Sequence, residues 1–75
     1  MQEDRRFLRA LLSALIAERP DAEGLYVPRG EAGMRRMIRA LLAMRPAPEG
    51  GDPLAGDIAR FERMENSAQP DRNAF

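Results

Sequence analysis

Three stretches of apolar residues recur at the spacing of an α-helix, and prolines interrupt the chain between them. This pattern constrains the fold more than any other feature of the sequence. The first stretch covers one half of a helical wheel with Phe7, Leu8, Leu11, Leu12, Leu15 and Ile16. Asp4 can cap its N-terminal end, and Pro20 stops it directly after Arg19. The pattern predicts a helix over residues 3–19.

Two further stripes predict two more helices. The second helix is expected over residues 30–45, with Glu31 in its first turn, Arg45 in its last turn and Pro46 after it. Its apolar positions are Met34, Met37, Ile38, Leu41 and Leu42. The third helix is expected over residues 53–65, after the N-cap and first-position pair Asp52 and Pro53. Its narrower stripe holds Leu54, Ile58, Phe61 and Met64.

The segments between and after the helices have their own signals. Residues 20–30 contain the β-prone triplet Leu25, Tyr26 and Val27 between Gly24 and Pro28. An extended segment there would lay Leu25 and Val27 on the helices, because alternate residues share a face, with Tyr26 as a half-buried anchor. Residues 66–75 are polar and lack periodicity, which predicts a disordered tail.

The sequence therefore predicts an all-α fold, a small three-helix unit in one domain over residues 1–65, with a short extended segment between the first two helices. We expect the first two helices to be antiparallel, which the connection of about ten residues permits, and the third helix to cross them. At 75 residues the chain is close to the lower size limit for a self-sufficient core. The predicted core consists of Phe7, Leu8, Leu11, Leu12, Leu15, Ile16, Leu25, Met34, Met37, Ile38, Leu41, Leu42, Leu54, Ile58 and Phe61.

Composition excludes several kinds of chemistry. The chain has no Cys and no His, so thiolate metal sites and Ser-His or Cys-His catalysis are excluded. The carboxylates that lie close in sequence, such as Glu62 and Glu65, are expected to be solvated. We expect no catalytic residue, no metal site and no cofactor. The charged start favours a folded helix over a signal peptide, and the apolar stretches are too short to span a bilayer. These features predict a cytoplasmic protein that makes no membrane contact.

Arginine supplies all 12 basic residues of the chain, and 12 acidic residues balance them. Arg35, Arg36 and Arg39 are expected to lie on the face of the second helix opposite its apolar stripe. Three interpretations are open: a solvated face with local ion pairs, a contact for a partner protein, or a contact for nucleic acid. Zero net charge and 5% aromatic residues make nucleic acid unlikely as a partner.

The middle of the chain also resembles a known family. Val27-Pro28, six further residues, and the run from Arg35 to Pro46, RRMIRALLAMRP, resemble the N-terminal helical segment of bacterial zinc-dependent macrodomain proteins, which are protein-ADP-ribose hydrolases. The resemblance covers about residues 6–65. That family's catalytic groups and its Cys- and His-bound zinc belong to a macrodomain that follows the helices. Because this chain has neither Cys nor His, the resemblance implies an accessory domain.

The leading hypothesis is thus a non-catalytic helical interaction module that packs on a macrodomain-type catalytic domain or on another protein. Its candidate partner contacts are Arg35, Arg36, Arg39 and Arg45, through charge-assisted hydrogen bonds to carboxylates or phosphates. One alternative is a free-standing homodimeric interaction protein that buries its remaining Met and Leu surface. A small arginine-rich nucleic-acid-binding protein is the third hypothesis.

Overall fold

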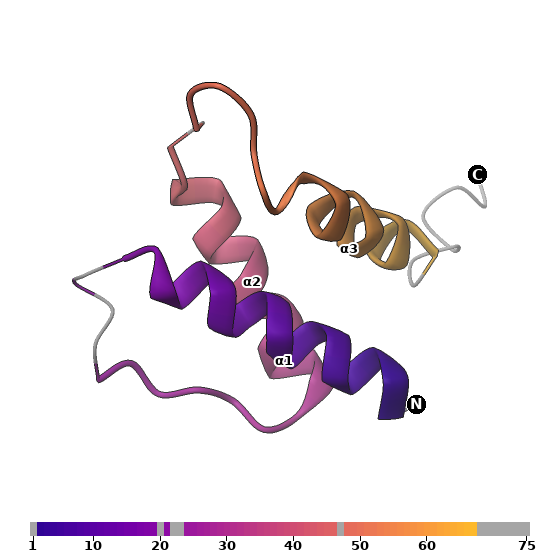
Figure 1. Cartoon of the computed structure of the whole chain (residues 1–75). Helices are drawn as coiled ribbons and strands as arrows, with labels where there is room; N and C mark the ends of the chain where they lie inside the picture. The colour runs from indigo at the N-terminus through magenta and orange to yellow at the C-terminus, as the bar shows by residue number, and fades with distance from the viewer. Residues whose placement is uncertain (1, 20, 22–23, 47, 68–75) are drawn as a thin grey trace, which may run out of the picture.

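A computed structural model describes residues 2–19, 21, 24–46 and 48–67 of the chain, and it contains three helices (Figure 1). They are α1 (Gln2–Ala17), α2 (Glu31–Met44) and α3 (Ala55–Ser67). No strand occurs within the described residues, and the predicted all-α three-helix unit is confirmed. Each helix begins and ends within two residues of the predicted bounds.

The ends of α1 and α2 differ from the predicted bounds for local reasons. After Ala17, the N–H groups of Glu18 and Arg19 donate to carbonyls three residues back, at 3.3 and 3.0 Å, so the last turn tightens before residue 19. Arg45 has extended dihedrals, φ −74° and ψ 126°, because the residue before a proline avoids the helical region. α2 therefore ends one residue early, at Met44.

The turn into α3 is organised by Asp52. Its Oδ1 accepts the N–H of Leu54 at 2.9 Å, and its carbonyl oxygen accepts the N–H of Ala55 at 3.1 Å. This turn occupies the predicted first positions of the helix, which begins at Ala55 instead. The helix runs on to Ser67, so Asn66 and Ser67 are helical and the prediction that they belong to a tail is wrong. The rest of that predicted tail, residues 68–75, lies outside the described residues.

The two long helices run in the same general direction, so the predicted antiparallel pairing is wrong. Figure 1 shows α2 crossing α1 with both C-terminal ends on one side, and an ion pair between Glu18 and Arg45 joins those ends. The thirteen residues between Ala17 and Glu31 can span up to about 45 Å when extended. The 14 residues of α2 rise only about 21 Å. The connection is therefore long enough to run back along the helices before α2 begins.

The core lies where the three apolar stripes meet. Every residue in it was predicted, and the packing of α1 on α2 is more extensive than that of α3 on α1. α3 contributes one buried side chain among its residues, Phe61. The buried residues are Leu8, Leu11, Leu12, Leu15, Met34, Ile38, Leu41 and Phe61. Partly buried side chains that pack against them are Phe7, Ile16, Met37, Leu42, Leu54, Ile58 and Met64.

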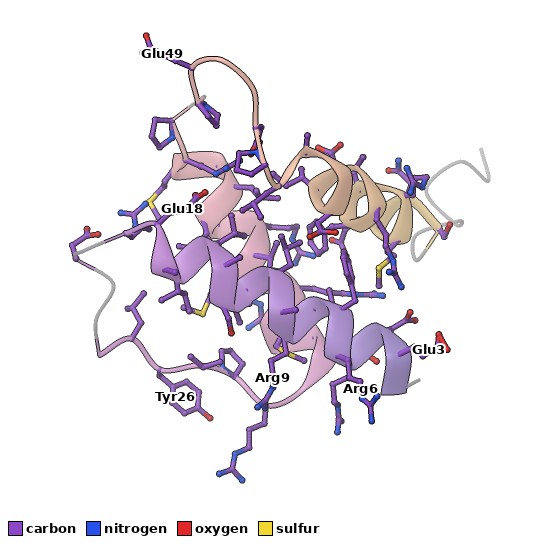
Figure 2. The ribbon with its side chains drawn as sticks, viewed as in Figure 1. Glu3, Arg6, Arg9, Glu18, Tyr26 and Glu49 are labelled. Atoms are coloured by element: carbon purple, nitrogen blue, oxygen red, sulfur yellow. The ribbon has the colours of Figure 1, made fainter. Side chains whose placement is uncertain are left out.

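The segment between α1 and α2 departs from its predicted role. Leu25, Tyr26 and Val27 are 47%, 79% and 40% exposed, so the predictions that Leu25 is in the core, that Val27 packs on the helices and that Tyr26 is half-buried are wrong. Figure 2 shows Tyr26 pointing away from the helices. The segment contacts α2 through Pro28, whose Cβ lies 2.6 Å from where a side chain on Gly33 would begin. Because α3 packs elsewhere on the helix pair, no described helix covers the triplet.

Candidate functional site

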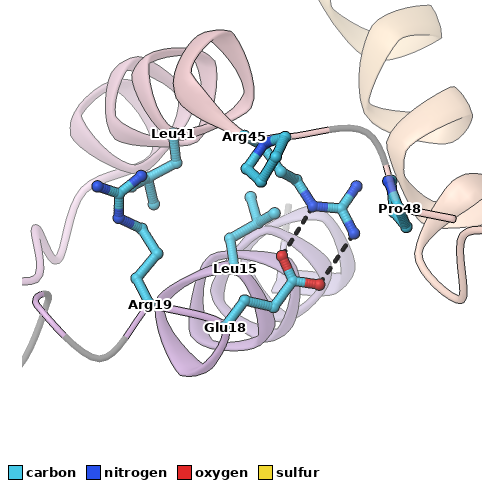
Figure 3. A pocket seen from close by; sticks show the side chains of 7 residues that line it. Leu15, Glu18, Arg19, Leu41, Arg45 and Pro48 are labelled. Atoms are coloured by element: carbon cyan, nitrogen blue, oxygen red, sulfur yellow. Dashed lines mark hydrogen bonds and ion pairs between the residues drawn. The ribbon is translucent and has the colours of Figure 1, made fainter.

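Arg45, one of the four predicted partner contacts, bridges two carboxylates of its own chain, those of Glu18 and Asp52, and Figure 3 shows its bonds to Glu18. Its Nε and Nη2 donate to the two carboxylate oxygens of Glu18 at 2.7 and 2.9 Å. Its Nη1 and Nη2 donate to the two oxygens of Asp52 at 2.6 and 2.8 Å. Only 10% of the Arg45 side chain is exposed. We call Glu18, Arg45 and Asp52 the Arg45 clamp, which joins the ends of α1 and α2 to the turn before α3.

The clamp stabilises the charged form of each of its members. Hydrogen bonds from Arg45, together with one from the N–H of Leu54, lower the pKa of Asp52 to about 2. The same guanidinium lowers the pKa of Glu18 from its ordinary value. Asp52 and then Glu18 raise the pKa of Arg45 in return. Both carboxylates are therefore ionised at neutral pH, which strengthens their hydrogen bonds to the guanidinium of Arg45.

A small apolar pocket lies beside the clamp, between the C-terminal ends of α1 and α2. It has a volume of about 250 Å³, and Figure 3 shows Leu15 and Leu41 on its walls, with Arg19 on the side opposite the clamp. Pro46 and Pro48 complete the apolar lining. Ligand sites for small molecules begin at roughly 300 Å³, so this pocket has the size for one apolar side chain rather than for a cofactor.

The three arginines in the middle of α2 do not share one environment. Arg39 donates a hydrogen bond to Glu65 of α3, and Nε of Arg35 lies 3.6 Å from the other oxygen of Glu65. Arg36 is exposed, and within the described part of the chain it has no ion pair. The predicted arginine face is therefore divided: Arg35 and Arg39 attach α3 to α2, and Arg36 faces solvent.

A second group of arginines was missed by the sequence analysis. Arg60 and Arg63 of α3 line a groove of about 530 Å³ together with Arg35 of α2 and Asp4 of α1. The guanidinium carbon of Arg60 lies 4.2 Å from the centre of the Phe7 ring, within the range of a cation–π contact. The spacing of three residues between Arg60 and Arg63 signals a shared helix face. Only the packing of α3 brings that face beside Arg35.

The acidic residues provide no metal centre in the part of the chain that is described. No group of three or more His, Cys, Asp or Glu residues there could hold a metal ion. Of the neighbouring carboxylates weighed in the sequence, Glu65 pairs with Arg35 and Arg39, whereas Glu62 is exposed. Their chemical role within the described residues is therefore charge pairing and solvation.

Comparisons with known proteins give this chain no relative. No family model, no curated protein and no solved structure matches it. The described helices include none that is long and apolar enough to cross a membrane. The resemblance to the helical segment of zinc-dependent macrodomain proteins thus stays a prediction, carried by the residues quoted for it.

Proposed function

We propose that this chain is a non-catalytic helical module that packs against a partner protein. The resemblance to zinc-dependent macrodomain hydrolases makes a macrodomain-type catalytic domain the first partner to consider. The observation that carries the proposal is the run of three exposed large apolar residues, Leu25, Tyr26 and Val27, on a unit whose helices are already packed.

These three residues have the chemistry of a protein contact. Tyr and other large side chains contribute most to protein interfaces, because they bury a large apolar area and Tyr keeps a polar group for a hydrogen bond. All three side chains are exposed, by 47%, 79% and 40%, so a partner surface can reach each of them. Isolated exposed apolar residues are ordinary, but three consecutive ones form a patch that a partner surface would cover.

The arginines divide between structural and contact roles in this proposal. Arg45 is held by the clamp, and Arg35 and Arg39 face Glu65, so these three already satisfy carboxylates within the chain. Arg36 is exposed without such an ion pair among the described residues, which leaves its guanidinium available to a carboxylate on a partner.

The test titrates the purified chain into a zinc-dependent macrodomain hydrolase from which its own N-terminal helices have been removed, and measures binding by calorimetry. We expect a complex with the parent chain. Its affinity should fall at least about tenfold in a Leu25→Ser/Tyr26→Ser double variant, because truncating a Tyr at the centre of an interface costs about 2 kcal/mol, more than the roughly 1.4 kcal/mol of a tenfold change. Met44→Ser is the matched control, since Met44 is 59% exposed at the end of α2 and away from the triplet.

Absence of binding by the parent chain, or equal affinity in the double variant, would reject this function. Sedimentation at two concentrations tests the homodimer hypothesis in parallel. A dimer that dissociates in the double variant but not in Met44→Ser would assign the triplet to self-association and overturn the accessory role. Circular dichroism of both variants should match the parent, because the substituted side chains are exposed.

A further inference from the structure

A groove lined by arginines lies between the first turn of α1, the first half of α2 and the C-terminal part of α3. Its volume is about 530 Å³, and it is lined by Asp4, Arg35, Arg60, Arg63, Met64 and Ser67. We propose that this arginine groove binds the phosphate group of a small molecule, such as a phosphate monoester. This inference is independent of the proposed protein partner, since none of the lining residues belongs to segment 24–27.

Arg35 lines the groove and also lies beside Glu65. Its Nε atom is buried and has no hydrogen-bond partner, because the nearest Glu65 oxygen is 3.6 Å away and Arg39 also binds Glu65. This Nε is shielded from solvent, but a guanidinium has five N–H donors, so the terminal nitrogens of Arg35 can contact a ligand. The side chain is 23% exposed, so Arg35 can still contact an oxyanion in the groove.

Arg60 is oriented before any ligand arrives. Its guanidinium carbon lies over the Phe7 ring, 4.2 Å from the ring centre, in a cation–π contact. Within the described residues no hydrogen bond or ion pair engages the N–H donors of Arg60, so they are available for bidentate bonds to phosphate oxygens. Arg63 lies three residues further along α3 and lines the same groove. Neither arginine forms an ion pair within the described part of the chain.

Charge favours a phosphate group over a carboxylate. Three guanidinium groups and one carboxylate, that of Asp4, line the groove. Arg35 also lies 3.6 Å from Glu65, so the net positive charge of the site comes mainly from Arg60 and Arg63. A phosphate monoester carries about −1.5 to −2 at neutral pH, whereas a carboxylate carries −1. The hydroxyl of Ser67, also in the lining, is a further donor. Because the whole chain has no net charge, the groove offers a local site rather than an extended track for a nucleic-acid backbone.

The experiment titrates inorganic phosphate and glycerol phosphate into the chain at neutral pH and constant ionic strength, and follows amide and arginine Nε–H signals by NMR. We expect saturable shifts at Arg35, Arg60 and Arg63. Arg63→Gln should weaken binding about three- to tenfold, the loss of one charge-assisted hydrogen bond at an open site. Asp4→Asn should strengthen binding about two- to fivefold by removing the repelling charge.

Arg36→Gln is the matched control. It removes one positive charge from α2 beside Arg35, but Arg36 does not line the groove. Phosphate affinity in Arg36→Gln should stay within about twofold of the parent, because exposed charges outside the site are screened by salt. Arg63 is exposed, so its substitution leaves the helices intact, which a thermal melt verifies.

Three results would overturn the proposal. Equal losses of phosphate affinity in Arg63→Gln and Arg36→Gln would show that phosphate is attracted only by the overall positive charge and not by a specific site. Shifts that do not saturate by about 10 mM phosphate would exclude a site of millimolar affinity. Tight, strongly salt-dependent binding of a single-stranded oligonucleotide without saturable phosphate binding would assign the arginines to nucleic acid instead.

Discussion

Replacing Phe61 with Ala should destabilise the whole fold, although α3 makes fewer contacts than the other helices. Phe61 is 2% exposed and is the buried side chain through which α3 joins the core. Truncating a buried Phe to Ala costs about 3–5 kcal/mol. A chain of this length has a total stability of about 4–11 kcal/mol, from the usual contribution per residue. The substitution therefore removes a large share of the free energy of unfolding.

The remaining contacts of α3 cannot offset this loss. Arg39 is half exposed in its pair with Glu65, and ion pairs at exposed positions contribute at most about 1 kcal/mol. α1 and α2, of 16 and 14 residues, would then have to hold a two-helix core alone, although helices of this length are marginal in isolation. We expect loss of α3 docking and loss of helix in α1 and α2 within one transition.

The assay is a thermal melt followed by circular dichroism. At about 4–8 °C per kcal/mol for a domain of this size, Phe61→Ala should lower Tm by roughly 12 °C or more. Phe61→Leu, which keeps most of the volume, should cost less than about 1.5 kcal/mol. Glu62→Ala, at the neighbouring exposed position, should change stability by less than about 0.5 kcal/mol. A Phe61→Ala melt that overlays the Glu62→Ala melt would refute the view that α3 belongs to the core.

Two further predictions concern one glycine each in α2 and α3, and the Arg45 clamp. Gly56→Ala should stabilise the chain by about 0.5–1 kcal/mol, because the new Cβ has no neighbour within 4 Å. Gly33→Ala should not stabilise the chain, because its new Cβ would lie 2.6 Å from the Cβ of Pro28. Urea unfolding of the two variants measures both changes in the free energy of unfolding. If the Gly33→Ala variant is as stable as the Gly56→Ala variant, the close approach of Pro28 to Gly33 is contradicted. The pKa of Asp52 lies at about 2, below its ordinary 3.8, so the stability from its ion pair is full above about pH 4 and is lost as the pH falls from 4 toward 2. In melts across that range, the Tm of Asp52→Asn should fall less with decreasing pH than the Tm of the parent. Glu49→Gln is the control, since Glu49 is exposed on the loop before α3 (Figure 2). If the Tm of Asp52→Asn falls as steeply as that of Glu49→Gln, the stabilising role of the clamp is rejected.

Much of the fold was predictable because helix periodicity is a local property. The stripes of the three helices predicted every residue of the buried core, and Asp52 marked the start of α3 to within a few positions. The direction of α2 relative to α1 was not predictable, because the connection between them is long enough for either orientation. Leu25 illustrates the same limit, since local sequence shows that a residue is apolar but not whether another element will cover it.

The candidate sites divide in the same way. The sequence marked Arg35, Arg36 and Arg39 as a cluster and Arg45 as the charge at a helix end, both from spacing along one helix. It did not pair Arg45 with Glu18, 27 residues away, or bring Arg60 beside Phe7, because those contacts cross between helices. Charge pairs between elements depend on how the elements pack, and periodicity contains no information about that packing.

The amino-acid sequence by itself determined three amphipathic helices, their approximate ends, the members of the core and the absence of Cys and His chemistry. These follow from backbone geometry and from side-chain type, which act over a few residues. The tertiary structure alone decided that α1 and α2 run the same way, that Arg45 is enclosed by two carboxylates, and that three arginines line one groove. Those features arise from the packing of apolar faces, which brings distant charges together whatever their separation in the chain.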